Sequence, residues 1–271
     1  MRNTLQIDLE KIELERLKEL FQILDEASAE CGTNYYIIGA LAKLAWYSTT
    51  NIGAGMTRDV DIAVNVMLDD QYEKLVHTLV NKHKFRKIKH DPLRLQSPFG
   101  YTMDMIPFGI KSIDEKVDSE DNVTLFVNGF QEVANKGTVK AIDREREVEF
   151  EVATLPAILL LKLIAYGDRP EHRTQDPSDI RDIITHYFDI EDRLIYDRHN
   201  DLFDKYDELD EIAAVVIGRQ IRDIIEDNPK LSDRVLGILS SGKLVMEMTN
   251  EQITVNQAKR WFGLIAEGIK K

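Results

Sequence analysis

Hydrophobic and polar residues change their spacing partway along the chain, and this change predicts two differently built parts. Up to about Thr154, short alternating or β-branched apolar runs are interspersed with amphipathic helical segments. From Leu155 onward, apolar residues recur at helical spacing in successive segments. We therefore expect an α+β protein, with a mixed sheet flanked by helices over residues 1–154 and a helical domain over residues 155–271.

The same pattern predicts the individual elements. Apolar residues at helical spacing indicate an amphipathic helix over Leu9–Glu30 that leads into the first strand. Further helices are expected over Asp70–Lys82, Glu208–Glu226 and Gln252–Glu267. Strands are expected at Tyr35–Ile38, Asp59–Val66, around Phe85, and at Tyr101–Ile106, Leu125–Val127 and Val148–Val152.

Two aspartates lie two residues apart in the most informative strand, Asp59–Val66. Because side chains alternate across a strand, Asp59 and Asp61 share one face, while Val60 and Ile62 share the other. Two such carboxylates can hold one divalent cation or bridge two, and Mg²⁺ prefers a few carboxylate oxygens together with substrate phosphates. The alternative is a pair of solvated acids on an edge strand.

The preceding strand ends in a small-residue turn. Tyr35–Ile38 runs through Gly39 and Ala40 into Leu41–Tyr47, which has helical character. Free backbone N–H groups at a helix start can bind phosphate, and Gly39 lets the backbone approach closely because it has no Cβ. Such junctions are also common with a purely structural role.

A third acid, Asp104, stands alone in the apolar segment Tyr101–Pro107. A lone acid in such a strand is costly unless it is paired or bound to a metal, so it is a natural partner for Asp59 and Asp61. It could instead satisfy a local turn or a nearby arginine.

The second half of the chain places charges on apolar helices. Lys162 interrupts the nearly all-apolar segment Leu155–Tyr166, so its ammonium must snorkel to solvent or meet an anion, for which a triphosphate or an acidic side chain would serve. Asp176 and Asp179 are three residues apart and therefore neighbours on one helical face. Because Asp176 precedes Pro177, it also fits an N-cap.

Together these motifs resemble a known superfamily. The chain resembles the DNA polymerase β-type nucleotidyltransferases at Gly39-Ala40, at Thr57-Arg58-Asp59-Val60-Asp61 and at the later Asp104. It resembles the AbiEii-like group of that superfamily at Lys162–Pro170, His172-Arg173 and Asp176–Ile180. Many members of this group are toxins of bacterial toxin–antitoxin pairs. The C-terminal remainder matches no pattern of this kind.

The resemblance implies a nucleotidyltransferase core followed by a helical domain that completes an active-site cleft. The implied reaction depends on Mg²⁺, or on Mn²⁺, and moves a nucleoside monophosphate from an NTP to an acceptor hydroxyl. The implied metal ligands are Asp59, Asp61 and Asp104. These three acids and Lys162 are the implied catalytic residues, and Lys162 neutralises charge on the triphosphate. The implied nucleotide contacts are Gly39, Ala40, Thr57, Arg58, Lys162 and Asp179.

The chain also departs from the family pattern. Ala40 stands where the family turn usually has Ser or a second Gly, Gly55 where an Arg often precedes the acidic strand, and Gln175 where a Lys is common. The interval from Gly39 to Asp59 is long for the family. A non-catalytic nucleotide-binding protein on the same scaffold is therefore an alternative.

Composition narrows the classes of partner. The chain has 271 residues and a formal net charge of −13, which argues against a surface that coats nucleic acid broadly. Positive charge is nevertheless concentrated in one basic run, which consists of Lys82, His83, Lys84, Arg86, Lys87, Lys89, His90 and Arg94. This run could guide an acceptor toward the acids, or it could be a helix end followed by a solvated hairpin.

The apolar runs are too short to span a bilayer, and the N-terminus lacks a signal core. The lone Cys31 excludes an intramolecular disulfide and fits a reducing cytoplasm, where we expect the protein. The leading hypothesis is a toxin-like enzyme acting on RNA, such as a tRNA end, or on a protein, with an antitoxin as partner. The runner-up modifies a small molecule such as an antibiotic.

Overall fold

The computed structural model describes residues 4–12, 16–50, 52, 57–68, 70–109, 116–118 and 124–270. The chain divides into two compact units. The sheet unit contains residues 2–134 and 138–154, and the helical unit contains residues 135–137 and 155–271.

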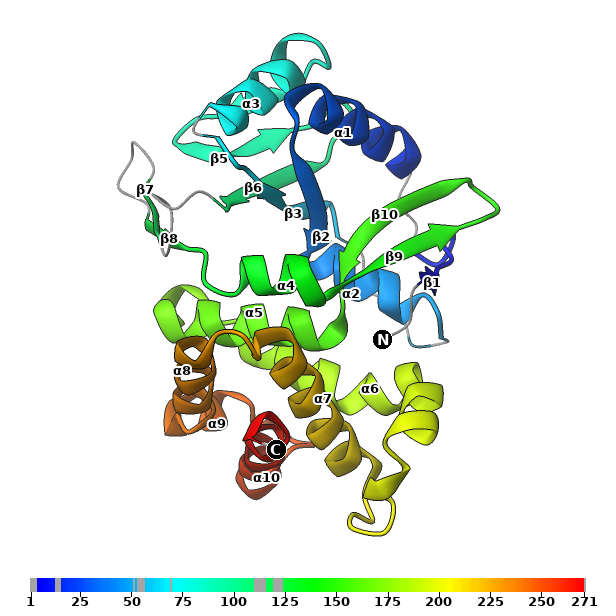
Figure 1. Cartoon of the computed structure of the whole chain (residues 1–271), viewed down its shortest axis with the longest axis vertical. Coiled ribbons are helices and arrows are strands. Elements are labelled where there is room, and N and C mark those ends of the chain that lie inside the picture. The colour runs from blue at the N-terminus through cyan, green and yellow to red at the C-terminus, as the bar shows by residue number, and fades with distance from the viewer. Residues whose placement is uncertain are drawn as a thin grey trace. The chain divides into compact units, whose positions relative to one another are not determined.

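The sheet unit is built on eight strands. They are β1 Thr4–Gln6, β2 Asn34–Ile38, β3 Asp59–Asn65, β4 Arg86–Ile88, β5 Asp91–Gln96, β6 Thr102–Phe108, β9 Thr138–Asp143 and β10 Val148–Ala153. They form one mixed sheet in the order β1-β9-β10-β2-β3-β6-β5-β4 (Figure 1). Strands β7 Lys116–Asp118 and β8 Thr124–Phe126 pair with each other separately. The predicted mixed sheet is therefore confirmed.

Helices cover the two faces of this sheet. Helices α1 Leu17–Cys31 and α3 Gln71–Asn81 lie side by side on one face of the sheet (Figure 1). The other face carries α2 Gly39–Tyr47 and α4 Phe130–Lys136. On that side the Trp46 indole donates to the Ala153 carbonyl at 2.9 Å, and the Tyr36 hydroxyl donates to the Phe130 carbonyl at 2.9 Å.

The alternation along β3 has the expected consequence. Val60, Ile62 and Val64 are buried toward α1 and α3, whereas Asp59 is exposed and Asp61 is half-buried on the α2 face. One side of this strand therefore builds core, and the other presents the acids.

The prediction of one helix over Leu9–Glu30 is wrong at its N-terminal end. Arg16, with a φ of 61°, is the left-handed N-cap, and α1 begins at Leu17. The buried side chains of Leu9 and Ile12 belong to a turn region, where the Leu9 N–H donates to Asp143 Oδ2 at 3.0 Å. Leu14, which the same pattern included, lies outside the described residues.

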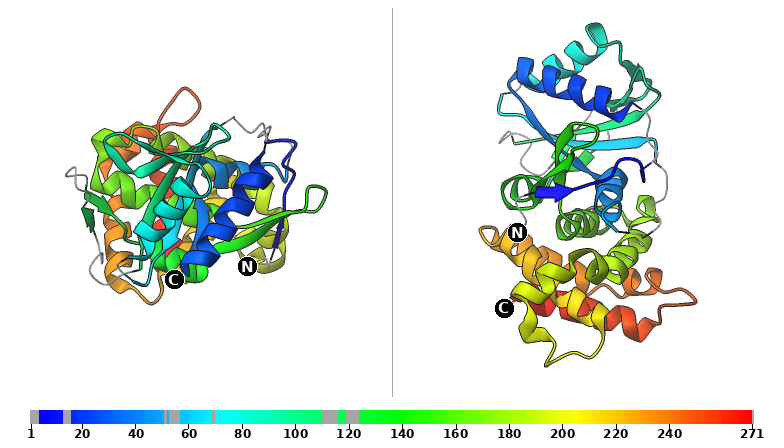
Figure 2. Two further views of the ribbon diagram at one scale, coloured as in Figure 1. Left: turned by 90° about the horizontal axis from the view of Figure 1, so that it is seen from above. Right: turned by 90° about the vertical axis from the view of Figure 1, so that its right-hand side faces the viewer.

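The helical unit contains the remaining described α-helices. They are α5 Leu155–Asp168, α6 Asp176–Arg198, α7 Leu209–Ile225, α8 Pro229–Leu239, α9 Gly242–Glu247 and α10 Val255–Lys270. Helices α7 and α10 pack closely (Figures 1 and 2), because Gly218 and Gly268 let the two backbones touch. The predicted C-terminal helical region is confirmed. None of the described helices is both long and apolar enough to cross a membrane.

Candidate active site

Three neighbouring strands bring charged side chains into one row. Asp61 of β3 is the register partner of Asp104 on the parallel strand β6, and Asp104 is the register partner of Arg94 on the antiparallel strand β5. Register partners point to the same face, and neighbouring strands are about 4.8 Å apart. Asp61, Asp104 and Arg94 therefore lie side by side on the face of the sheet that carries α2 and α4.

A second polar row lies next to the first on the same face. Asp59 pairs with Thr102 of β6, Thr102 pairs with Gln96 of β5, and Gln96 pairs with Arg86 of the edge strand β4. This row carries a carboxylate at one end and a guanidinium at the other. The two rows make this part of the sheet face polar across four strands.

Gly39 forms the turn from β2 into α2 and lies directly against Asp61. Its φ is +64°, and a Cβ built on it would overlap the Asp61 carboxylate. The N-cap residue of α2, Ile38, makes no side-chain hydrogen bond to the start of the helix. The positive end of the helix dipole therefore lies beside Asp61, where it favours an anion. Asp61 itself takes part in further interactions within the molecule.

Asp104 is held by Arg94 in a two-point ion pair. Nε of Arg94 lies 2.5 Å from Asp104 Oδ1, and Nη2 lies 2.6 Å from Oδ2. This hydrogen bonding raises the pKa of the Arg94 guanidinium above its usual value, against the opposing effect of its partial burial. The sequence allowed an arginine as partner of Asp104, but it could not name Arg94, because the register of β5 was not predicted.

The three predicted metal ligands share a face but do not converge. Within the described ranges, no set of three or more His, Cys, Asp or Glu side chains is grouped closely enough to hold a metal ion. The donor set nevertheless fits Mg²⁺ or Mn²⁺ in kind, because carboxylate oxygens are the ligands that such hard cations prefer. The placement of Asp61 and Asp104 on adjacent parallel strands also fits, provided that Asp104 turns from Arg94 toward Asp61. The metal assignment stays a prediction.

Thr57 and Arg58 lead into β3. The Thr57 hydroxyl accepts from the Asp59 N–H at 3.1 Å, and the Arg58 carbonyl accepts from the Thr102 N–H at 3.0 Å. The Arg58 side chain is exposed, and Ala40 is exposed at the start of α2. The residues predicted to contact the nucleotide here, Ala40, Thr57 and Arg58, are thus at least partly accessible to solvent. Gly55 lies outside the described residues.

In the helical unit, Lys162 meets two carboxylates. Its ammonium donates to Asp176 Oδ1 at 2.9 Å and to Asp179 Oδ2 at 2.7 Å. Asp176 is buried, and its Oδ2 has no hydrogen-bond partner among the described residues. These contacts account for a charged group in an apolar helix, because the half-buried ammonium is compensated by anions. Two of its three N–H donors are used in this way.

Asp176 does not cap α6 as the sequence predicted. The N-cap is Gln175, so the helix begins one residue earlier than expected and Asp176 is its first residue. The carboxylate of Asp176 accepts a hydrogen bond from Lys162 instead of capping the helix. Pro177 lies in the first turn, where proline is tolerated.

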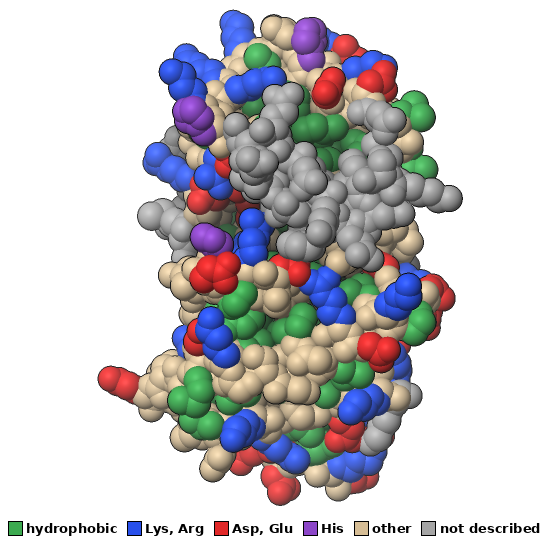
Figure 3. Space-filling model, turned by 90° about the vertical axis from the view of Figure 1, so that its left-hand side faces the viewer, with side chains coloured by type: hydrophobic (Ala, Val, Ile, Leu, Met, Phe, Trp, Pro, Cys, Tyr) green, Lys and Arg blue, Asp and Glu red, His purple; other side chains and the backbone are tan. Residues whose placement is uncertain are grey.

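The basic run forms the end of α3 and the hairpin of β4 and β5. Lys84, Arg86, Lys87 and Lys89 are exposed, and Lys82 pairs with Glu30 at 2.6 Å. Lys and Arg side chains gather in the upper part of Figure 3, which views the side on which β5 lies in Figure 1. The hairpin expected as the structural alternative is therefore present, and it also exposes cations.

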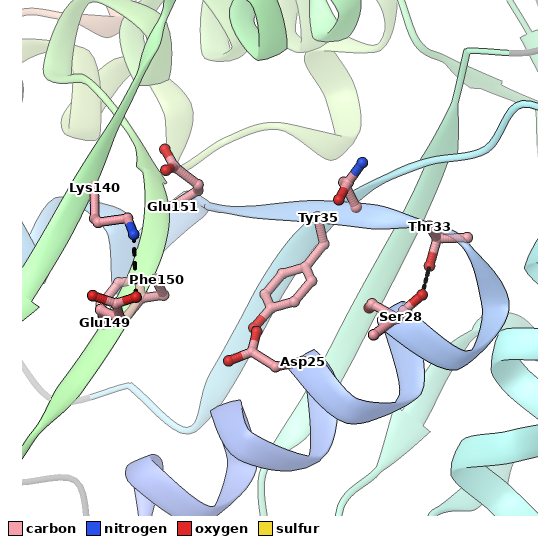
Figure 4. A pocket seen from close by; sticks show the side chains of 10 residues that line it. Asp25, Ser28, Thr33, Tyr35, Lys140, Glu149, Phe150 and Glu151 are labelled. Carbon is pink, nitrogen blue, oxygen red and sulfur yellow. Dashed lines mark hydrogen bonds and ion pairs between the residues drawn. The ribbon is translucent and has the colours of Figure 1, made fainter.

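A cavity of about 470 Å³ opens elsewhere in the sheet unit, between α1, β2, β9 and β10 (Figure 4). Strands β2 and β10 are joined there at one register pair, Val152 with Ile37. Its charged lining is Asp25, Glu149, Glu151 and Lys140, and Lys140 is paired with Glu149 at 3.1 Å. This excess of acid does not suit a triphosphate, so the polar rows remain the candidate site.

Comparisons with known proteins give little beyond the fold. No protein-family model matches the chain, and no curated protein matches it. Solved structures that resemble it include the antibiotic-resistance factor ANT(2'')-Ia, with 13% identity and a TM-score of 0.34 over 56% of this chain and 72% of that one. Another is an antigenic nucleotidyltransferase-like protein from Paracoccidioides brasiliensis, with 14% identity and a TM-score of 0.41 over 82% of this chain and 92% of that one. At these TM-scores, a functional assignment depends on the chain's own residues.

Proposed function

We propose that the protein is a nucleotidyltransferase that moves a nucleoside monophosphate from an NTP to an acceptor hydroxyl. The observation that carries the proposal is the register pair of Asp61 and Asp104 on adjacent parallel strands, beside the start of α2 at Gly39. Two acids beside a helix N-terminus on one polar face are suited to binding a metal–phosphate complex.

Mg²⁺, or Mn²⁺ in its place, would be held by Asp59, Asp61 and Asp104. When bound, the cation would supply positive charge to the phosphate oxygens and to the acceptor oxygen. The half-buried positions of Asp61 and Asp104 would limit competition from water.

The chain's own groups would bind and orient the reactants. The first N–H groups of α2, at Gly39 and Ala40, would donate to phosphate oxygens, since Ala40 has no hydroxyl to do so. Asp104 would accept the proton of the acceptor hydroxyl as its oxygen attacks the α-phosphorus. The bond from the α-phosphorus to the bridging oxygen would break, and pyrophosphate would leave.

Lys162 would contribute charge from the helical unit. Asp176 and Asp179 already fix the ammonium, which leaves its third donor for a phosphate oxygen. Asp179 would thus act as a positioning residue for Lys162. This role follows from the resemblance to the superfamily, together with the two hydrogen bonds.

For the acceptor we propose RNA, such as a tRNA end, or a protein, with the AbiEii-like toxins as the model and an antitoxin as partner. The exposed cations of the β4–β5 hairpin favour a polyanion on the side of Arg94. The net charge of −13 favours the second candidate, a cationic small molecule such as an antibiotic.

Incubation of the protein with Mg²⁺, each α-labelled NTP and either total RNA, cell protein or aminoglycosides tests this proposal. We expect label on one acceptor class with wild type and none with Asp61→Asn. The control is Asp25→Asn, because Asp25 lies on the opposite side of the sheet from the proposed site. There its carboxylate accepts a hydrogen bond from the Tyr35 hydroxyl at 2.7 Å. Nucleotide binding without transfer to any acceptor would favour a non-catalytic protein.

A further inference from the structure

The ion pair between Arg94 and Asp104 lies where the proposed reaction needs a free carboxylate. Both oxygens of Asp104 accept hydrogen bonds from the guanidinium, at 2.5 Å and 2.6 Å. Among the residues that the structure describes, the pair continues the row that begins at Asp61. The guanidinium therefore bonds to the same oxygens that a cation between Asp61 and Asp104 would use.

We propose that Arg94 is a built-in counter-cation, which holds Asp104 while no divalent cation is bound and releases it when one binds. The inference rests on the proposed function, because it assumes that Asp59, Asp61 and Asp104 take a divalent cation. In this role Arg94 is a positioning residue that lowers the affinity of the free site for the cation.

Charge explains why the two cations compete. Each carboxylate oxygen has two lone pairs, so Asp104 has enough acceptor capacity for both partners. A guanidinium and a divalent cation on one carboxylate, however, repel each other within a few ångströms, and the half-buried setting screens that repulsion less than water does. The stable arrangements are therefore Arg94 on Asp104, or the cation on Asp104 with Arg94 turned away.

The strand that carries Arg94 also offers the displaced guanidinium a second partner. Asp91 Oδ2 lies 3.7 Å from Arg94 Nε, three residues earlier in the chain. The side chains of Arg94 and Asp91 are 42% and 40% exposed, so the guanidinium has room to turn toward solvent and Asp91. The release of Asp104 thus requires only a side-chain rotation on β5.

The ion pair of Arg94 and Asp104 also affects whether the cation enters the site alone or already bound to the nucleotide. A site whose third carboxylate is already neutralised binds a free divalent cation weakly. A cation that arrives on a triphosphate brings its own oxygen ligands and needs fewer from the protein. Arg94 therefore favours entry of the metal–nucleotide complex over entry of the bare cation.

Titration of the full-length protein with Mn²⁺, followed by the electron paramagnetic resonance signal of free Mn²⁺ without nucleotide, tests the inference. We expect Arg94→Ala to bind Mn²⁺ about tenfold more tightly than wild type, the scale of a charged hydrogen-bonded pair. Arg94→Lys keeps the charge but not the two-point geometry and should fall between them. Asp91→Asn removes the second partner and should weaken binding.

The matched control is Arg86→Ala, which removes the same charge from the same face. Arg86 lies two strand spacings from the strand of Asp104 and three from that of Asp59, about 10 Å and 14 Å, and it bonds to neither, so Mn²⁺ affinity should stay within twofold of wild type. Circular dichroism tests whether each variant is folded. If Arg94→Ala is unfolded, the Mn²⁺ affinity of Arg94→Lys tests the counter-cation role in its place.

The outcomes separate this inference from the proposed function. If wild type binds Mn²⁺, Asp61→Asn does not, and Arg94→Ala binds no more tightly than wild type, the counter-cation role is wrong while the cation site stands. If neither wild type nor Arg94→Ala binds Mn²⁺, the cation site is wrong and the inference is overturned with it. Tighter binding by Arg94→Ala alone, with Arg86→Ala unchanged, supports it.

Discussion

Gly39 is the residue on which the acidic face depends most directly. It adopts a φ of +64°, where side chains other than glycine are strained, and it lies against the Asp61 carboxylate. The sequence suggested that Gly39 permits the approach of a phosphate. In the structure, the group that comes close is the acid on the neighbouring strand.

We predict that Gly39→Ala removes nucleotidyl transfer and Mn²⁺ binding together, because the new Cβ displaces Asp61. The unfolding free energy should fall by about 1–3 kcal/mol through the left-handed backbone and the overlap. Activity assays beside denaturant unfolding check this. Gly100→Ala is the control, because it has a φ of +88° but nothing within 4 Å of its Cβ, so it should lose stability without losing Mn²⁺. Full activity in Gly39→Ala would contradict the close approach.

The three acids could be predicted from the sequence, but not all of their partners could. The period of two placed Asp59 and Asp61 on one face, and the isolation of Asp104 marked it as needing a partner. The arginine that meets it comes from a segment, Asp91–Gln96, whose polar composition does not predict a strand. Register between distant strands is a tertiary property, so Arg94 could not be assigned from local pattern.

Helices α7 and α10 show close packing at the scale of elements. A Cβ on Gly218 would overlap the carbonyl oxygen of Ile265, and one on Gly268 would overlap that of Val215. The two helix backbones therefore touch where glycines remove the side chains. The helical spacing of apolar residues predicted the two helices, but it gave no sign that their backbones meet.

We predict that Gly218→Ala lowers the unfolding free energy by about 2–3 kcal/mol, because the helices must separate to accept the methyl group. Gly237→Ala in α8 is the matched control, since nothing lies within 4 Å of its Cβ. That substitution should be neutral or stabilising by about 0.5–1 kcal/mol through helix propensity. Thermal and urea unfolding of both variants measure the difference, and equal losses would refute the proposed backbone contact.

The connection from α6 to α7 contains His199, which contacts an arginine of α7. His199 Nδ1 accepts from the Arg219 guanidinium at 3.1 Å, and burial, followed by the charge of Arg219, lowers the pKa of His199. Protonation would remove the acceptor and place two cations together.

Because the folded-state pKa lies below the unfolded value of 6.5, the contribution of His199 to stability is complete above that pH. It is lost as the pH falls from there through the folded-state pKa. We predict that His199→Asn, which can still accept the Arg219 bond, flattens the decline of melting temperature between neutral pH and pH 5. Parallel melting curves across pH check this, and an unchanged slope would show that His199 does not contribute.

At the scale of the whole molecule, the change of pattern near residue 155 coincides with the start of α5. The mixed sheet and the helical region both follow from that pattern. The start of α1 was missed because Leu9 and Ile12 are buried by tertiary contacts in a turn, which mimics helical spacing. A cleft between the two parts, with Lys162 facing a nucleotide, stays a prediction.

Asp61 and Asp104 are proposed to support transfer of a nucleoside monophosphate, and following two labels on one NTP tests that role. The protein would be given Mg²⁺, cellular RNA and protein, and the same NTP labelled either at the α- or at the γ-phosphate, with Asp61→Asn and Asp25→Asn in parallel. We predict that the α-label joins the acceptor and the γ-label leaves as pyrophosphate, with wild type and Asp25→Asn but not with Asp61→Asn. Transfer of the γ-label, or α-transfer that survives Asp61→Asn, would contradict the account.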